Sequence, residues 1–242
     1  MAIFVAFITL MFLTASSDRR LTSLLKKRLE EWVLDGAGLF VQGVLIPLLQ
    51  ITVIAQIYRF LLPTAHSILN LHPVVAFCCS FVLVDYLYYW NHRLLHSRWF
   101  WPLHQVHHTM TEMDVLGTSR NTVWSSFFIL YLWIHALLLY LLQNPAAYGL
   151  GITLTAVLDL WRHSKMGPPF GSSLDRWLSP WLILPQDHAW HHAIAANNCN
   201  YGANLKLWDK LHGTSYQSDR QPVSLGIQTN LTLTQKLFWP FP

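Results

Sequence analysis

Five apolar segments constrain the fold of this 242-residue chain more than any other feature. They cover residues 1–15, 38–62, 71–90, 122–142 and 146–161. A helix rises about 1.5 Å per residue and the hydrocarbon core of a bilayer is about 30 Å thick, so the middle three approach the length of a transmembrane span and the outer two are marginal. Helices give backbone polar groups their partners within lipid, and the segments lack the alternation of barrel strands. The sequence therefore predicts an all-α integral membrane helical bundle of about four to five spans.

The composition agrees with membrane as the solvent. Hydrophobic residues make up 53% of the chain and charged residues 12%, a balance unlike that of a water-soluble protein. The formal net charge is +4, but the basic residues are dispersed without an aromatic-rich patch, so we expect no nucleic-acid partner. Cys78 and Cys79 are adjacent and Cys199 stands alone, which predicts no disulfide framework.

The distribution of Lys and Arg predicts the orientation of the spans. Apart from Arg59, every Lys and Arg falls within residues 16–37, 91–121 or 162–242, and a five-span arrangement places these stretches on one side of the membrane. Positively charged residues mark the cytoplasmic side. The segment Asp18–Trp32 is basic and amphipathic and is suited to lie at the membrane surface. We expect a multi-pass protein with a histidine-rich cap on the cytoplasmic face.

Thirteen histidines are present, and eight of them form three short motifs. The motifs are His92 and His96; His104, His107 and His108; and His188, His191 and His192. Residues i, i+3 and i+4 of a helix point to the same side, so each motif is able to present its imidazoles to a common centre. His163 follows the last apolar segment at the same predicted membrane depth and is the candidate ninth ligand.

This density of histidines predicts a site for two metal ions. Clustered imidazoles repel one another if protonated and lack hydrogen-bond partners if neutral and buried, unless metal ions take up their lone pairs. One ion accepts at most about six ligands and a catalytic ion leaves a position open, so two ions fit better than one. Imidazole suits zinc, copper, nickel or iron, so spacing leaves the metal open. The chain has no H-E-x-x-H motif, which disfavours a zinc protease.

Asp85 is the candidate for a supporting role beside the ligands. It lies seven residues before His92, on the same predicted helical face. A carboxylate there is able to accept the free N–H of a ligating imidazole and so fix its tautomer. A polar contact between packed helices is the alternative role.

The residues around the histidines extend the motifs. These stretches are Asp85–His96, Trp101–His108, Leu184–His192, Asn200–Gly202 and Leu207–Thr214. Together they resemble the fatty acid hydroxylase and sterol desaturase superfamily of membrane histidine-box di-iron oxygenases. The resemblance implies a centre of two iron ions, with O2 as co-substrate. The ligands it implies are His92, His96, His104, His107, His108, His163, His188, His191 and His192.

The resemblance also implies the reaction class and the partners. Such an enzyme hydroxylates or desaturates a C–H bond of a fatty acyl, sterol or isoprenoid lipid that enters from the bilayer. Its electrons come from an external donor of the cytochrome or ferredoxin type. A histidine-rich, zinc-binding membrane transporter or sensor without redox catalysis is the alternative, and metal analysis separates the two.

The chain length suits a single unit, which we divide into three parts. Residues 1–70 are expected to form an N-terminal membrane anchor with the amphipathic basic segment. Residues 71–220 are expected to form the fatty acid hydroxylase-like catalytic domain, and residues 221–242 a C-terminal tail.

Overall fold

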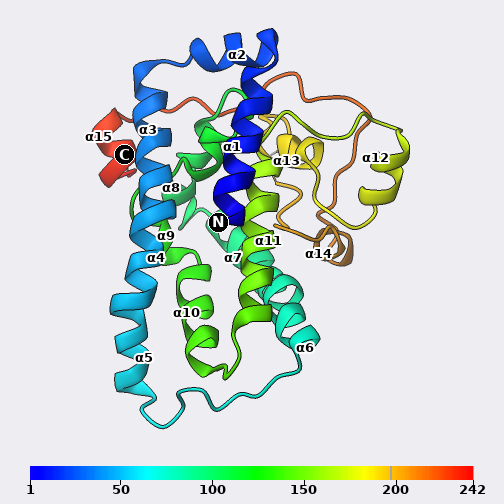
Figure 1. Cartoon of the computed structure of the whole chain (residues 1–242). Helices are drawn as coiled ribbons and strands as arrows, with labels where there is room; N and C mark the ends of the chain where they lie inside the picture. Colours follow the sequence, from blue (N-terminus) through cyan, green and yellow to red (C-terminus); the bar gives the residue numbers. More distant parts are fainter. Residues whose placement is uncertain (197, 242) are drawn as a thin grey trace.

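Helices make up the regular structure of the computed structural model, which describes residues 1–196 and 198–241 (Figure 1). Within these residues β-structure is limited to isolated bridges, such as the one between Leu182 and Leu205. The predicted all-α class is therefore confirmed.

The α-helices include long rods and short surface segments. They are α1 (Ala2–Ala15), α2 (Asp18–Leu25), α3 (Leu29–Phe40), α4 (Ile46–Leu49), α5 (Ala55–Leu61), α6 (Pro73–Cys78), α7 (Val84–Leu95), α8 (Trp101–His104), α9 (Ser125–Phe128), α10 (Tyr131–Leu141), α11 (Ala146–Arg162), α12 (Ser173–Leu178), α13 (Pro185–His191), α14 (Leu207–Leu211) and α15 (Leu233–Phe238). Wider π-helical turns are η1 (Val41–Leu45), η2 (Gln50–Ile54) and η3 (Cys79–Leu83), and 3-10 turns are η4 (His107–Thr109) and η5 (Leu116–Ser119).

The longest rod runs continuously from Leu29 to Leu61 through α3, α4 and α5. Pro47 in α4 has no N–H to donate to the preceding turn, and the helix widens to η1 just before it. Within α4 and η2, Ile46 and Ile54 pack against Leu132 and Ala136 of α10. Much of the remaining rod surface is apolar and exposed.

A second rod runs from Pro73 to Leu95 through α6, η3 and α7. Pro73 suits the first turn of a helix because its missing N–H would have had no partner there, and the His72 ring accepts from the main-chain N–H of Val74. α11 packs along α6 and η3, and α1 packs along α11. This arrangement brings the ends of α7 and α11 toward the same end of the molecule as α8 and α13, away from the loop between α5 and α6 (Figure 1).

The apolar segment 122–142 is not one continuous helix. It is divided at Ile129, whose backbone is extended, into α9 and α10. The side chain of Asn91 on α7 bonds the main chain on both sides of the break, donating to the carbonyl of Phe128 (2.9 Å) and accepting from the N–H of Leu130 (3.2 Å). Partners from another helix thus replace the helical hydrogen bonds lost at the break.

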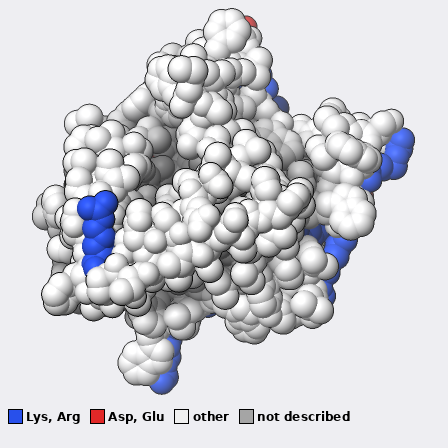
Figure 2. Space-filling view, turned by 60° about the horizontal axis from the view of Figure 1, so that its bottom comes forward, with Lys and Arg blue, Asp and Glu red and all other residues white. Residues whose placement is uncertain are grey.

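Among the described residues, two helices are long and apolar enough to cross a membrane, Leu29–Leu61 and Pro73–Leu95. A third span results if α1 and α2, which are bent by 102° relative to each other, are counted together. Figure 2 shows a face that carries few Lys or Arg side chains and is otherwise almost uncharged. The membrane character of the chain is supported, while the number of four to five spans stays a prediction.

Gly38 allows α3 to approach the end of η5 closely. A Cβ at Gly38 would overlap the main-chain carbonyl oxygen of Ser119, whereas Gly36 on the same helix has nothing within 4 Å of its Cβ position. We expect Gly38→Ala to lower the free energy of unfolding by about 1–3 kcal/mol. Gly36→Ala should leave it unchanged or raise it by up to roughly 1 kcal/mol, because Ala favours a helix. Thermal unfolding of both variants in detergent checks this, and equal melting temperatures would contradict the close contact.

Candidate metal centre

Helix ends carry the predicted histidines into one buried region. His92 lies in the last turn of α7, and His96 is its C-cap. His104 ends α8, and η4 contains His107 and His108. His163 is the C-cap of α11, and α13 carries His188 and His191, with His192 as its C-cap. A helix C-terminus has partial negative charge, so these positions favour a cation.

The nine histidines form two groups in which one ring nitrogen of each residue lies within 4.8 Å of the others. The five-histidine group contains His92, His96, His104, His108 and His191; the four-histidine group contains His107, His163, His188 and His192. The groups adjoin, with the ring centroids of His108 and His192 4.5 Å apart. All nine candidates are therefore brought together, and their role as ligands stays a prediction.

The second and third motifs do not each serve a common centre, which corrects the sequence-based expectation. His107 and His108 belong to different groups, and so do His191 and His192. Neighbouring residues of a helix point about 100° apart, so adjacent histidines diverge to either side. His188 and His192, four residues apart on one face, stay in the same group. The two adjacent histidines at the end of each of these motifs therefore contribute one ring to each group.

Main-chain carbonyls orient four of the rings. The Nδ1 atoms of three rings donate to carbonyl oxygens of other segments: His92 to Tyr201 (2.8 Å), His107 to Arg120 (3.1 Å) and His191 to Cys199 (2.7 Å). Nδ1 of His163 donates to the carbonyl of Asp159 (2.8 Å), one turn earlier on α11. A carbonyl oxygen only accepts, so the proton of each neutral ring lies on Nδ1 and its Nε2 presents a lone pair. Each histidine group contains two rings held in this way.

The contact between His107 and His163 tests whether the site fits a metal ion. Their Nε2 atoms, both bearing lone pairs, are 3.4 Å apart. Burial lowers the pKa of His107 to about 3, so His107 carries no second proton at neutral pH. His188 adds a third nitrogen, its Nε2 lying 3.0 Å from that of His163. A metal ion that accepts these lone pairs removes their repulsion, and the donor set fits one.

The five-histidine group shows the same need for a cation. The Nε2 atoms of His96 and His191 and both ring nitrogens of His108 are buried without a hydrogen-bond partner among the described residues. A buried polar atom without a partner costs about 1–3 kcal/mol. Trp101 packs against the rings of His96 and His108, with centroids 5.2 Å from each. The apolar indole helps to exclude water from these nitrogens.

Asp85 does not make the direct contact with an imidazole that was predicted. Its carboxylate accepts from the main-chain N–H groups of Asn204 (2.8 Å) and Leu205 (3.0 Å) and from the indole of Trp208 (2.8 Å). The prediction was wrong about the partner because helical spacing gives the face on which Asp85 lies but not which segment packs against that face. Asp85 instead holds the start of the segment that leads into α14.

Asp209 supports the ring of His92 and was not recognised from the sequence. Its carboxylate accepts from the main-chain N–H groups of Tyr201 and Gly202, both at 2.8 Å, and from the hydroxyl of Thr214 at 2.7 Å. These bonds place the Tyr201 carbonyl that receives the His92 proton. Any residue type has such a carbonyl, so no sequence signal marks Tyr201 as the acceptor.

A buried ion pair anchors the third motif. Lys206 donates to Asp187, directly before His188, with a nitrogen to oxygen distance of 2.8 Å. Asp187 also accepts from the main-chain N–H of Leu184 at 2.9 Å, which caps the start of α13. The pair connects the segment before α14 to the helix that carries His188, His191 and His192.

The sequence predicted a C-terminal tail over residues 221–242, and its described part, residues 221–241, packs against the histidine motifs. The main-chain N–H of Ile227 donates to the carbonyl of His108 (2.8 Å), and that of Gly226 donates to the carbonyl of His192 (3.2 Å). The side chain of Gln105 donates to the carbonyl of Pro240 at 2.7 Å. This segment therefore covers the site.

Comparison with known proteins identifies the family. Residues 77–214, more than half of the chain, match the model of the fatty acid hydroxylase family. The chain belongs to the fatty acid hydroxylase family. The match includes all nine histidines of this family member and begins after the Leu29–Leu61 rod. The resemblance seen in the sequence is confirmed.

Several curated relatives of this fatty acid hydroxylase family member have named activities. The ornithine lipid hydroxylase OlsE of Rhizobium tropici is 34% identical over 57% of this chain and 41% of its own length. The alkylglycerol monooxygenase of Homo sapiens is 28% identical over 61% of this chain and 32% of its own length. Methylsterol monooxygenase 2-1 of Arabidopsis thaliana is 24% identical over 55% of this chain and 53% of its own length.

The chain thus spans only about a third to a half of the length of these relatives. No solved structure matches the chain.

The buried histidines predict that acid destabilises the metal-free protein. Burial lowers the pKa of His107 and of His191 to about 3, from the usual 6.5. The unfolded chain therefore binds protons at these rings below pH 6.5 while the folded protein does not, so their contribution to stability is complete above that pH and is lost as the pH falls toward 3. We expect a lower melting temperature at about pH 5 than at about pH 7.5. A higher melting temperature in acid would contradict this.

Proposed function

We propose that this chain is a membrane-bound di-iron oxygenase that hydroxylates or desaturates a lipid C–H bond with O2 and externally supplied electrons. The observation that carries the proposal is the pair of adjoining histidine groups. Membership of the fatty acid hydroxylase family and relatives named as lipid hydroxylases or monooxygenases support it.

In this proposal the five-histidine group binds one iron ion and the four-histidine group binds the other. When bound, iron supplies the redox chemistry that couples O2 to oxidation of a C–H bond. The chain contributes neutral imidazoles whose lone pairs point inward, because carbonyls hold the Nδ1 protons of His92, His107, His163 and His191. Held in this way, the rings need no reorientation when an ion binds.

The position of the site supports a lipid substrate. The five-histidine group begins at the end of the Pro73–Leu95 rod, which is apolar and long enough to span a bilayer. Exposed Leu87, Trp90 and Leu94 continue the apolar surface of that rod to the level of the histidines. A lipid chain lying along this surface is able to bring a carbon atom close to the centre without passing through water, and burial of the rings keeps water away from it.

The reaction requires an electron source. In hydroxylation one oxygen atom enters the C–H bond and the other leaves as water, so a pair of electrons and a pair of protons must be supplied. We propose a cytochrome or ferredoxin type of donor that docks from the cytoplasm. All Lys and Arg except Arg59 fall within residues 16–37, 91–121 and 162–242. This distribution supports a cytoplasmic histidine-rich face and a bundle of about four to five spans. In this proposal residues 71–220 form the catalytic domain.

Metal content and lipid analysis test the proposal. The purified protein should contain about two iron ions per chain, and cells that express it should accumulate a lipid with an added hydroxyl group or double bond. We expect His107→Ala and His192→Ala to lower product formation by at least about 100-fold, because each removes a ligand. His66→Ala, which removes an exposed histidine between α5 and α6, is the matched control and should retain activity.

Three results together would instead support the transporter or sensor: the wild-type chain would hold zinc in both groups, form no oxidised lipid and transport zinc. Full activity in His107→Ala would show that His107 is not a required ligand.

A further inference from the structure

We propose that Asp35 is a positioning residue for His107, so that the N-terminal part of the chain completes the four-histidine group. This inference rests on the proposed metal-binding function. Asp35 lies on α3, outside residues 77–214 that match the family model. The sequence-based division assigned this part of the chain to a membrane anchor, without a role in the centre.

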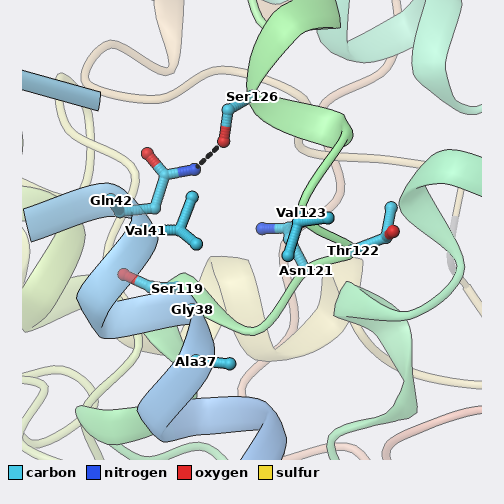
Figure 3. Close-up of a pocket in the computed structure, with 9 residues that line it drawn as sticks. All are labelled: Ala37, Gly38, Val41, Gln42, Ser119, Asn121, Thr122, Val123 and Ser126. Atoms are coloured by element: carbon cyan, nitrogen blue, oxygen red, sulfur yellow. Dashed lines mark hydrogen bonds between the residues drawn. The ribbon is translucent and has the colours of Figure 1, made fainter. Parts of the chain in front are cut away.

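One face of α3 packs against the segment that follows the second histidine motif. Asp35, Gly38 and Gln42 are spaced i, i+3 and i+7, which places them on the same face of a continuous helix. Gly38 lies directly against the main chain of Ser119, and the side chain of Gln42 donates to the hydroxyl of Ser126 at 2.7 Å (Figure 3). The contact therefore extends along residues 119–126 rather than being limited to one pair.

Asp35 binds Arg120 through two hydrogen bonds. Nε of Arg120 donates to Oδ1 of Asp35 at 2.6 Å, and Nη2 donates to Oδ2 at 3.0 Å. Both side chains are 1% exposed, so solvent does not screen the pair as it does at a surface. The planar guanidinium and carboxylate thereby fix the position and the direction of the Arg120 side chain.

Arg120 transmits this position to the metal centre through its own main chain. Its carbonyl oxygen accepts the Nδ1 proton of His107 at 3.1 Å. The side chain and the carbonyl belong to one residue, so loss of the contact with Asp35 would free Arg120, and with it the acceptor of His107, to move. The ring of His107 would then turn, and its Nε2 would leave the position 3.4 Å from Nε2 of His163.

Lys27 and Asp114 secure the other end of the same segment. Lys27 pairs with both Asp35 and Asp114. Asp114 in turn accepts from the main-chain N–H groups of Leu116 (2.9 Å) and Gly117 (3.1 Å), at the start of η5. Residues 27–42 thus hold both the start and the end of the turn that carries the Arg120 carbonyl.

Apolar replacement of a whole buried ion pair is often neutral or stabilising, so stability alone does not account for this pair. Its role in this proposal is to place the acceptor of His107. Partners that orient a metal ligand typically contribute about 10- to 100-fold in metal affinity. We expect an effect of that size on the ion held by the four-histidine group.

The test is a titration of the metal-free protein with Co²⁺, whose visible absorption reports its ligands. The wild-type chain should bind about two ions, and Asp35→Asn should weaken one of them by about 10- to 100-fold without weakening the other. Glu30→Gln is the matched control: it removes a carboxylate from the same helix, where Glu30 pairs with Lys236 of α15 and not with the ligand-bearing segment. This control should bind both ions as tightly as the wild type.

The double variant Asp35→Asn/Arg120→Met separates positioning from an uncompensated buried charge. It removes both charges of the pair. Lys27 keeps Asp114 as its partner, and Glu31, which also pairs with Arg120 (3.5 Å), keeps Arg28. We expect a melting temperature near that of the wild type and an ion that is still bound about 10- to 100-fold more weakly.

Recovery of both the melting temperature and the affinity would overturn the inference, and so would tight binding of two ions by Asp35→Asn. A wild-type chain that binds no Co²⁺ would overturn the proposed function as well.

Discussion

Repulsion between buried imidazole lone pairs is the constraint on which the rest of this structure depends. In the four-histidine group, the protons of His107 and His163 are held on Nδ1 by main-chain carbonyls, so their Nε2 lone pairs face each other. Burial opposes protonation of His107, and a cation between the two rings removes the repulsion. The helix C-termini of α7, α8, α11 and α13 meet around the same centre and add partial negative charge that favours a cation.

Carboxylates bind the segments that carry two of the carbonyls holding the rings. Asp209 places the carbonyl of Tyr201 for His92, and Asp35 acts through Arg120 on His107. In each case the carboxylate binds a segment of main chain rather than the ring itself. The site therefore draws on α14 and on α3, and residues 221–241 cover it through the carbonyls of the second and third motifs. Parts of the chain that look like an anchor and a tail contribute to the same buried centre.

Much of the candidate site could be predicted from the sequence because helical spacing is a local property. The three motifs were found in this way, and His163 was found from its place at the end of the last apolar segment. Their division into two groups could not be predicted, since it depends on where α11 and α13 lie relative to η4. The partner assigned to Asp85 was wrong because spacing shows the face of a helix but not which loop packs on it. The interruption at Ile129 was missed for a similar reason: Asn91, which compensates for it, lies on another helix.

By itself, the sequence determined the all-α class, the apolar segments and the histidines that are candidate ligands of the site. Those properties follow from composition and from periodicity within single helices. Only the tertiary structure decided which histidines share a group, which carbonyl receives each Nδ1 proton, and that Asp35 pairs with Arg120. These features join residues that are distant along the chain, and a main-chain carbonyl has no residue type by which a pattern could mark it.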